Sequence, residues 1–488
     1  MTHQTFVALL AAAALAACSR PTPEQQIVND AAAAMGGRDR ILAVKTLVIE
    51  GDGTQYNLGQ DVVPNASGQT FTVTSYKRAI DVAGGRQRIE LTRQPNFTFF
   101  QGRAPQKQTQ GIDGKVGYNV AANGTATRIS NAAADDRRAE VAHTPLTAVR
   151  AALAPTAVLA HPRTEGTESL VDVTSGGRTF TLAIDSTSKL PTRVVSRMYN
   201  VNLGDVAITT SFADYQQVGG LQLAARLTTK TDDYTTAELR ALKQAVDADT
   251  GDLAAPADAA KAPEVAAPLP VTVAVEPLAP GVTLLAGGSH HSALVEFNDH
   301  LMLIEAPQNE QRTLAVIAKA REVVPGKPLT QVVNSHHHFD HTGGIRAAIS
   351  EGLTIITHQG NVAMFQEFAT RPHTIVPDAL SKNQKPAMVE GVAEDRTITD
   401  GSMTVTLYPV TGAHSETMLV AYLPKERLLI EVDVYTPGGA VHMFAATLLD
   451  QLKKRNLRID RMVSLHGKVV PYAQFVKEAT PPSATATH

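Results

Sequence analysis

The stretch Val332–Gly344, "VVNSHHHFDHTGG", constrains this chain more than any other, because it packs four of the 16 histidines and one aspartate into residues 336–341. An apolar run precedes the cluster, and Gly343-Gly344 leads from it into a helix-like segment. Side chains alternate along a strand, so His336 and His338 are expected on one face and His337 on the other. Neutral imidazole and carboxylate are ligands that zinc and similar divalent ions prefer. The stretch therefore predicts a metal site.

Three further polar residues stand out against apolar surroundings downstream. His414 lies within "VTGAHSETMLVAYLP", Asp433 ends the run "RLLIEVD", and His466 ends "MVSLHG". An unpaired carboxylate at the end of a buried strand is costly, and coordination to a cation offsets that cost. Glu431 lies two residues before Asp433 on the same strand face and is the alternative carboxylate.

The motif His-x-His-x-Asp-His, followed by His, Asp and His, is similar to the ligand order of the metallo-β-lactamase fold hydrolases. The match covers about residues 271–479, and the glyoxalase-II-like and lactonase-like branches of that superfamily share all seven ligand types. By this resemblance, one ion is expected on His336, His338 and His414, a second on Asp340, His341 and His466, and Asp433 between them. Two zinc ions are expected, with iron or manganese as alternatives.

The resemblance implies a hydrolase that uses a hydroxide activated by two metal ions, because paired cations lower the pKa of a shared water. We expect Asp340 to orient this hydroxide and to help pass a proton to the leaving group. A small molecule with an ester, thioester, lactone or phosphodiester bond is the expected substrate. β-Lactamases of this fold generally have Cys or Ser near the bridging position, so Asp433 disfavours β-lactam cleavage without excluding it.

Three more residues are candidates for substrate contact. His290 and His291 lie in the loop "GGSHHS", from which they could reach over the metals, although loop histidines are more often solvated. Lys468 follows His466 and could contact an anionic substrate, although a solvated lysine is the simpler interpretation.

The pattern of apolar residues predicts an α/β protein with two domains. Residues 271–479 alternate short apolar strands with helical segments, which suits an αββα sandwich of the metallo-β-lactamase type. Residues 31–244 instead alternate apolar and polar residues between turns, which predicts a separate, mainly antiparallel and strongly curved β domain. The Ala/Pro-rich stretch 245–270 is expected to be a semi-extended linker.

Within the first domain, "IDSTSKLPTRV" and "TSFADYQQVGGLQL" resemble the strand pattern of periplasmic lipoprotein carriers, which are half-open β-barrels. This resemblance covers roughly residues 30–235. It supports a second hypothesis, in which the protein binds a lipid or a lipoprotein in the cell envelope and the metal domain is ancillary.

The first 18 residues are expected to be an export signal. The apolar run in "FVALLAAAALAACS" is shorter than the ~20 residues that span a membrane and fits the core of a signal peptide. Leu15–Cys18, "LAAC", resembles the lipobox of bacterial lipoproteins, which implies a lipid anchor on Cys18. By the same resemblance, Ser19 favours the outer membrane and a periplasm-facing protein. A plain Ala-rich signal peptide is the alternative, and residues 19–30 are expected to be a polar tether.

Composition narrows the remaining function classes. Hydrophobic residues make up 43% of the chain and charged residues 19%, as in globular proteins. The net charge of −3 and the lack of a long Lys/Arg stripe argue against nucleic acid as a partner. The single cysteine excludes an intrachain disulfide, and the tail 480–488 is expected to be disordered.

Overall fold

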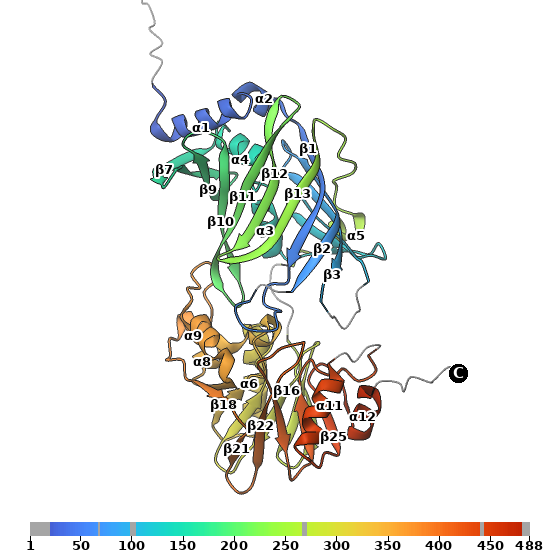
Figure 1. The fold of residues 1–488 in the computed structure, drawn as a ribbon. Coiled ribbons are helices and arrows are strands. Elements are labelled where there is room, and N and C mark those ends of the chain that lie inside the picture. Colours follow the sequence, from blue (N-terminus) through green and yellow to red (C-terminus); the bar gives the residue numbers. More distant parts are fainter. Residues whose placement is uncertain (1–19, 67–68, 98–103, 266–270, 440–443, 481–488) are drawn as a thin grey trace, which may run out of the picture.

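The computed structural model describes residues 20–66, 69–97, 104–265, 271–439 and 444–480. It has two domains stacked end to end: an N-terminal β-rich domain and a C-terminal α/β domain (Figure 1). Cys18 and the expected signal peptide lie outside the described residues, as does most of the tail. No helix in the described part of the chain combines the length and the apolar character needed to cross a bilayer.

The N-terminal domain is built on one 13-stranded sheet in which all neighbouring strands pair antiparallel. Its strands, in sheet order, are β6 (Ala126–Arg128), β5 (Val116–Val120), β4 (Gln106–Asp113), β3 (Arg86–Pro95), β2 (Thr70–Asp81), β1 (Thr46–Tyr56), β13 (Tyr234–Val246), β12 (Leu221–Thr231), β11 (Gly204–Val218), β10 (Pro191–Asn200), β9 (Arg178–Asp185), β8 (Glu168–Ser175) and β7 (Val158–Glu165). The prediction of a mainly antiparallel β domain is confirmed. The resemblance to lipoprotein carriers stays a prediction.

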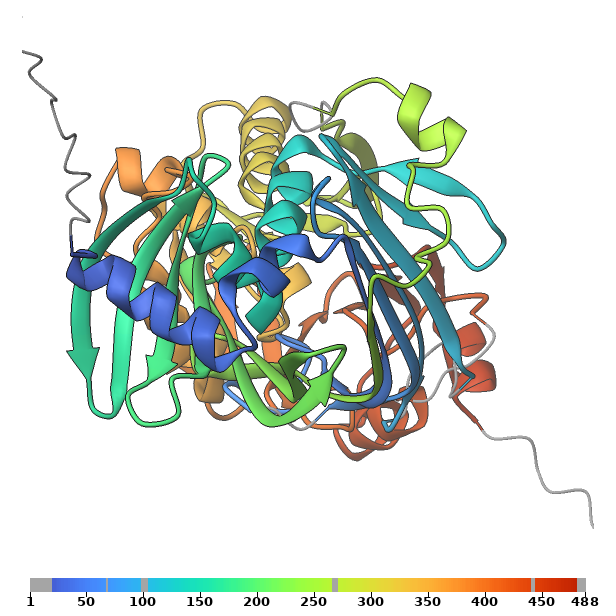
Figure 2. The same cartoon turned by 90° about the horizontal axis from the view of Figure 1, so that it is seen from above.

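In the described part of the chain, five helices accompany this sheet: α1 (Pro23–Ala34), α2 (Arg38–Ala43), α3 (Asn131–Glu140), α4 (Pro145–Ala152) and α5 (Ala257–Lys261). Seen from above, the sheet curves around α3 and α4 (Figure 2). Leu146 and Val149 of α4 share one buried apolar cluster with Val28 of α1 and with strand residues such as Leu182. Packing of α1 and α4 against these strands therefore excludes water from this apolar cluster.

The segment expected to be a polar tether and the segment expected to be a semi-extended linker both contain regular structure. The tether 19–30 becomes helix from Pro23, because Thr22 caps it, Gln25 completes a capping box and Val28 is buried. In the linker 245–270, β13 continues to Val246 and Leu253 packs beside the N-terminal sheet. Residues 266–270 lie outside the described residues.

The C-terminal domain is a sandwich of two sheets. The first contains β14 (Ala274–Ala279), β15 (Val282–Ala286), β16 (Ser292–Glu296), β17 (Leu301–Ile304), β18 (Leu329–Val333), β19 (Thr354–His358) and β20 (Val389–Val392). The second contains β21 (Arg396–Thr399), β22 (Thr404–Val410), β23 (Met418–Leu423), β24 (Leu428–Glu431), β25 (Arg461–Ser464) and β26 (Val469–Pro471).

Helices cover the outer faces of both sheets, as Figure 1 shows. They are α6 (Glu310–Val323), α7 (Phe339–Thr342), α8 (Ile345–Ser350), η1 (Gln359–Asn361), α9 (Val362–Thr370), α10 (Ala379–Lys382), α11 (Ala445–Lys454) and α12 (Tyr472–Ala479). On β17, Met302 and Ile304 face the core between the sheets, whereas Leu301 and Leu303 face the core under α6, α8 and α9. Successive side chains of β17 therefore pack alternately into two apolar cores. The predicted αββα sandwich is confirmed.

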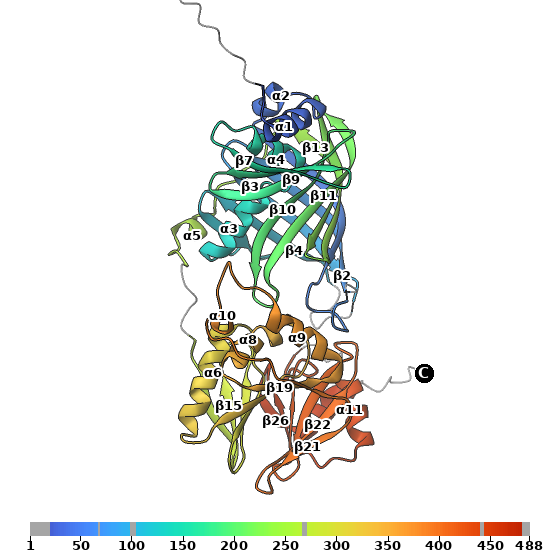
Figure 3. The same ribbon diagram turned by 90° about the vertical axis from the view of Figure 1, so that its left-hand side faces the viewer.

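The two domains are joined by more than the linker (Figure 3). Leu203 and Val206 of the N-terminal domain belong to the apolar cluster beneath the C-terminal helices. The carboxylate of Asp205 accepts hydrogen bonds from the backbone N–H groups of Thr374 and Ile375, at 2.9 to 3.0 Å. The domains therefore share both apolar and polar contacts.

Candidate metal centre

The seven predicted ligands converge at the edge of the sandwich that faces the N-terminal domain. The loop after β18 carries His336 and His338, and the short α7 carries Asp340 and His341. Residues 334–338 form a loop, so the predicted strand alternation through the histidines is wrong. The loop lets side chains next to each other in sequence reach different parts of one site.

The other three ligands come from the second sheet. His414 follows β22, Asp433 follows β24 and His466 follows β25. Asp433 has a φ of 63°, an uncommon backbone conformation for a residue with a side chain, and such conformations concentrate at functional sites. The sharp turn after β24 turns the Asp433 carboxylate toward the histidines.

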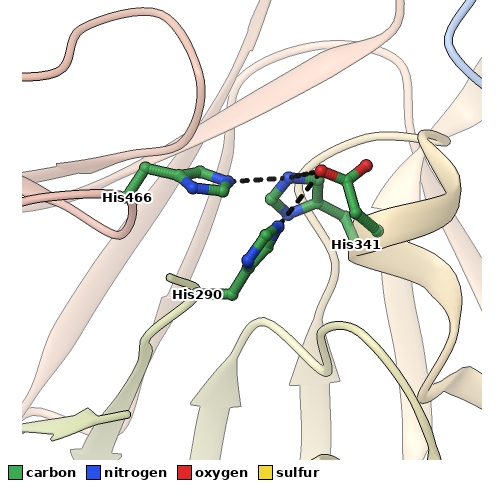
Figure 4. A group of neighbouring side chains, drawn as sticks. His290, His341 and His466 are labelled. Atoms are coloured by element: carbon green, nitrogen blue, oxygen red, sulfur yellow. Dashed lines mark hydrogen bonds and ion pairs between the residues drawn. The ribbon is translucent and has the colours of Figure 1, made fainter. Parts of the chain in front are cut away.

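Two groups of ligand atoms lie close enough together to hold an ion each. In each group the ligand atoms lie within 4.8 Å of one another. One group is His336, His338, His414 and Asp433, and the other is His290, Asp340, His341 and His466. The histidines of the second group point their nitrogens toward one another in Figure 4.

The carboxylate of Asp433 contacts members of both groups. Its Oδ2 lies 3.1 Å from Nε2 of His414 and 3.0 Å from Nε2 of His341, and its Oδ1 lies 2.7 Å from Nε2 of His466. This placement fits the predicted bridging carboxylate. Glu431, the alternative, instead accepts hydrogen bonds from the backbone N–H groups of Val434 and Tyr435.

Pairs of histidine Nε2 atoms that face each other are the clearest sign that this cluster fits cations. Nε2 of His414 lies 3.2 Å from Nε2 of His336, and Nε2 of His466 lies 3.1 Å from Nε2 of His341. Two ring nitrogens at this distance either share one proton in a hydrogen bond or, when both lack a proton, bring two lone pairs together, and a shared cation satisfies the second arrangement. The same approach occurs once in each half of the site.

His338 supplies an independent test of the fit. Its Nε2 lies 2.9 Å from the carbonyl oxygen of Asp61, and since a carbonyl can only accept, this nitrogen carries the proton. Its Nδ1 is buried and has no hydrogen-bond partner among the described residues. A buried lone pair without a donor is costly, and ligation to a metal satisfies it.

The protonation states also suit cation binding. Burial lowers the pKa of His336 and of His338, and neighbouring histidines lower both further, so these rings are neutral. Burial raises the pKa of Asp433, but the charges of His341 and His466 outweigh it and hold that pKa well below its usual value. Neutral imidazole and ionised carboxylate are the forms that bind metal. Burial alone would lower the pKa of His341, but Asp433 and Glu305 raise it well above its usual value, so this ring must release a proton when it binds an ion.

Glu305 is a functional residue that the sequence analysis missed. It follows β17, is buried, and its Oε2 lies 2.8 Å from Nδ1 of His341. Its Oε1 accepts a 2.7 Å hydrogen bond from the backbone N–H of Ser335. A carboxylate on the far nitrogen of a ligating histidine fixes its tautomer and leaves Nε2 for the metal.

The three candidate substrate contacts have different surroundings. Nε2 of His290 lies 3.1 Å from Oδ2 of Asp340, so this residue belongs to the centre. His291 faces its own loop, where its Nδ1 accepts a hydrogen bond from the N–H of Gly287. Lys468 is exposed to solvent.

His337, which was expected to point away from His336 and His338, makes its contacts outside the two ligand groups. It is buried, and its Nε2 lies 2.8 Å from the carbonyl oxygen of Asp61, while its Nδ1 faces the hydroxyl of Thr417 at 3.2 Å. It lies outside both ligand groups, and it connects the histidine loop to the N-terminal domain and to β23.

Close packing explains the glycines after the histidines. A Cβ on Gly344 would lie 1.8 Å from Oγ1 of Thr313 and 2.5 Å from the carbonyl oxygen of Ala306. Only glycine fits there, and the tight approach ties the end of α7 to the first sheet.

Comparison with known protein families gives one match, which lies within the C-terminal domain. Residues 285–430 match the family described as the metallo-beta-lactamase superfamily. The C-terminal domain thus has the metallo-β-lactamase fold, and this superfamily suggests a metal-dependent hydrolase. Among curated proteins, none matches the sequence.

Solved structures similar to the chain include three described as metallo-β-lactamases. The enzyme from Pontibacter korlensis is 17% identical over 43% of this chain and 97% of its own, with a TM-score of 0.34. DIM-1 is 18% identical over 43% of this chain and 96% of its own, with a TM-score of 0.33. FIM-1 from Pseudomonas aeruginosa, in its mono-zinc form, is 17% identical over 43% of this chain and 95% of its own, with a TM-score of 0.34.

Proposed function

We propose that the protein is a dinuclear metal-dependent hydrolase of the cell envelope. It acts on a small molecule that contains an ester, thioester, lactone or phosphodiester bond. The observation that carries the proposal is the convergence of imidazole nitrogens on Asp433, with opposed Nε2 atoms 3.1 to 3.2 Å apart in both halves of the site.

The chemistry follows from what the residues would hold. His336, His338 and His414 would hold one ion, Asp340, His341 and His466 a second, and Asp433 would contact both. Two bound cations, zinc or alternatively iron or manganese, would supply an activated water and polarise the bond to be cleaved. No serine or cysteine nucleophile is required.

The protein's own residues would orient the reaction. Asp340 is 38% exposed at its side chain, so it can reach both a substrate and a proton to be moved. Its hydrogen bond with His290 and the charge of His341 outweigh burial and lower its pKa, which keeps it ionised as an acceptor. Asp433, His414 and His466 are 14 to 17% exposed, so one side of the centre is open to a ligand.

The direct test is metal analysis of the purified full-length protein together with a panel of ester, thioester, lactone, phosphodiester and β-lactam substrates. We expect about two metal ions per chain and hydrolysis that a chelator abolishes and added metal restores. Fewer than about one ion per chain after incubation with zinc would reject the proposal. Cleavage of the β-lactam alone would replace the proposed substrate class with the alternative one.

A groove in the N-terminal domain favours the second candidate function, binding of a lipid or a lipoprotein. It has a volume of about 540 Å³ and is lined by apolar residues such as Val82, Val141 and Phe180, with Arg138 and Arg178 among its polar residues. Such a groove suits an acyl chain, while both arginines already pair with the carboxylate of Asp135. Saturable binding of a fluorescent fatty acid, unchanged by a chelator, would support this function, and lack of saturation would reject it.

We also propose that the chain is an outer-membrane lipoprotein anchored through Cys18. The support is the apolar run that ends in "LAAC" and the start of α1 at Pro23, which leaves a short connection to the anchor. Mass spectrometry of membrane fractions should find a lipid-modified N-terminal peptide. The Cys18→Ser variant should lose it, and an unmodified mature wild type would contradict the proposal.

A further inference from the structure

A short segment of the N-terminal domain reaches into the metal centre. Residues 59–62, here called the docking segment, belong to the loop between β1 and β2, which Figures 1 and 3 show at the junction of the domains. At one end, the carbonyl oxygen of Gly59 accepts a 3.0 Å hydrogen bond from the N–H of Phe339. At the other, the carbonyl oxygen of Val62 accepts a 2.8 Å hydrogen bond from the N–H of Glu416. The segment is therefore fixed to the start of α7, directly after His338, and to the loop that carries His414.

The carbonyl group of Asp61 sets the tautomer of one predicted ligand. It accepts hydrogen bonds from Nε2 of His338, at 2.9 Å, and from Nε2 of His337, at 2.8 Å. Because His338 keeps its proton on Nε2, its lone pair lies on Nδ1, the buried atom that lacks a partner among the described residues. Without Asp61, either nitrogen of this ring could carry the proton.

The side chain of Gln60 holds a ligand of the other ion. Its Nε2 donates a 2.7 Å hydrogen bond to Oδ1 of Asp340, while His290 lies 3.1 Å from Oδ2 of the same carboxylate. Each oxygen of Asp340 thus has one hydrogen-bond partner, one from each domain. Hydrogen bonds of this kind orient ligating carboxylates and tune the metal they bind.

Gly59 shows that the fit is close. Its φ is +74°, and a Cβ at this position would lie 2.2 Å from Cγ of Phe339. Any other residue would be strained at this φ, and its Cβ would have to move away from the Phe339 ring. The position of the docking segment therefore depends on this glycine.

We propose that the docking segment is a positioning element of the metal centre, in which Asp61 orients His338 and Gln60 orients Asp340, so that the N-terminal domain completes the site. This inference rests on the proposed function, because it assigns the two contacts to ligands of the two proposed ions. It gives the N-terminal domain a role in metal binding, whatever ligand its groove takes.

The test compares metal affinities of full-length variants by competition with a chromogenic chelator. Gly59→Ala should displace the whole segment and weaken both ions by about 10- to 100-fold, the usual effect of losing an outer hydrogen-bond partner. Gly85→Ala is the matched control, because Gly85 also has a positive φ, +66°, but an added Cβ there meets no atom within 4 Å. It should bind both ions like the wild type.

A second variant separates the two contacts and avoids any folding defect of Gly59→Ala. Gln60→Met keeps the length of the side chain and removes the donor, so it should weaken only the ion on Asp340. Cobalt(II)-substituted protein should show an altered visible absorption spectrum for that ion alone. Gln69→Met is the control, since Gln69 lies in the same loop and contacts Asp61 through its backbone N–H.

The outcomes separate this inference from the proposed function. A wild type that binds fewer than about one ion per chain would reject the proposed function itself. A wild type that binds two ions, with unchanged affinities and cobalt spectra in both Gly59→Ala and Gln60→Met, would overturn the positioning role alone. Weakening of both ions in Gly59→Ala and of one in Gln60→Met is the result we expect.

Discussion

His143 of the N-terminal domain and His338 of the C-terminal domain are both buried, but their ring nitrogens have opposite surroundings. In the N-terminal domain, Nδ1 of His143 lies 2.8 Å from the hydroxyl of Thr210, and its Nε2 lies 2.9 Å from the hydroxyl of Ser196. In the C-terminal domain, Nδ1 of His338 has no partner among the described residues, and the Nε2 atoms of His336 and His414 face each other. Burial of an imidazole is therefore no sign of a metal, whereas several imidazole nitrogens that converge on one carboxylate are.

The largest contrast is expected from changing Asp433. Asp433→Asn keeps the shape of the side chain but removes the negative charge between the imidazoles. Metal affinity and hydrolysis should fall by more than the about 100-fold that loss of an outer hydrogen-bond partner costs, because a ligand of both ions is changed. Metal analysis and initial rates measure this, and a variant that keeps two ions would contradict the bridging assignment.

Metal binding should stabilise the protein through the C-terminal histidines alone. At 100 times its dissociation constant, one ion should add about 2.7 kcal/mol to the free energy of unfolding. Denaturant titration with and without zinc measures the gain. Asp433→Asn should lose it and His143→Gln should keep it, so equal gains in both variants would remove the distinction between the two domains.

His143 should instead make the free energy of unfolding depend on pH. Burial, aided by the charge of Arg78, lowers the pKa of His143 from 6.5 to about 3. Between these values the unfolded chain binds a proton that the folded chain does not, so stability is full above pH 6.5 and is lost as the pH falls toward 3. The slope approaches about 1.4 kcal/mol per pH unit.

His143→Gln should flatten this part of the pH profile of stability. At neutral pH it should cost about 1 to 3 kcal/mol, because one of the two hydroxyl groups loses its partner. Urea titrations from pH 4 to pH 8 measure both effects. An unchanged slope would show that other groups cause the pH dependence.

The smallest effect is expected at Glu431. Burial raises the pKa of Glu431 to about 8, so this side chain is neutral near pH 7. Glu431→Gln should therefore change stability by less than about 1 kcal/mol and leave the metal content unchanged, since the amide oxygen can still accept the two backbone hydrogen bonds. Loss of metal in this variant would show that Glu431 contributes to metal binding in addition to Asp433.

Much of the site could be predicted because its ligands carry a sequence pattern. His414, Asp433 and His466 each follow an apolar strand, where a polar residue has to find a partner. Glu305 offered the same signal at the end of "LMLIEAP" and was overlooked. The pattern of apolar residues likewise predicted the sandwich, because strands between two apolar cores, such as β17, bury residues on both faces.

The contribution of the N-terminal domain could not be predicted. Gln60 lies 280 residues from Asp340 in the sequence, and Asp61 lies 277 from His338. Asp61 acts through its backbone carbonyl, which every residue has, so its identity carries no information. The helix α1 was also missed, because its first residues are mostly polar and its buried residues are few: Val28, Ala31 and Ala32.

The most direct test of the central claim is an anomalous-difference map from crystals of the full-length protein saturated with zinc, recorded at the zinc absorption edge. The account predicts two peaks roughly 3.5 to 4 Å apart, with Asp433 between them. One peak should contact Nδ1 of His338 and the other the carboxylate of Asp340. A map without peaks at these residues, from crystals saturated with zinc, would contradict it.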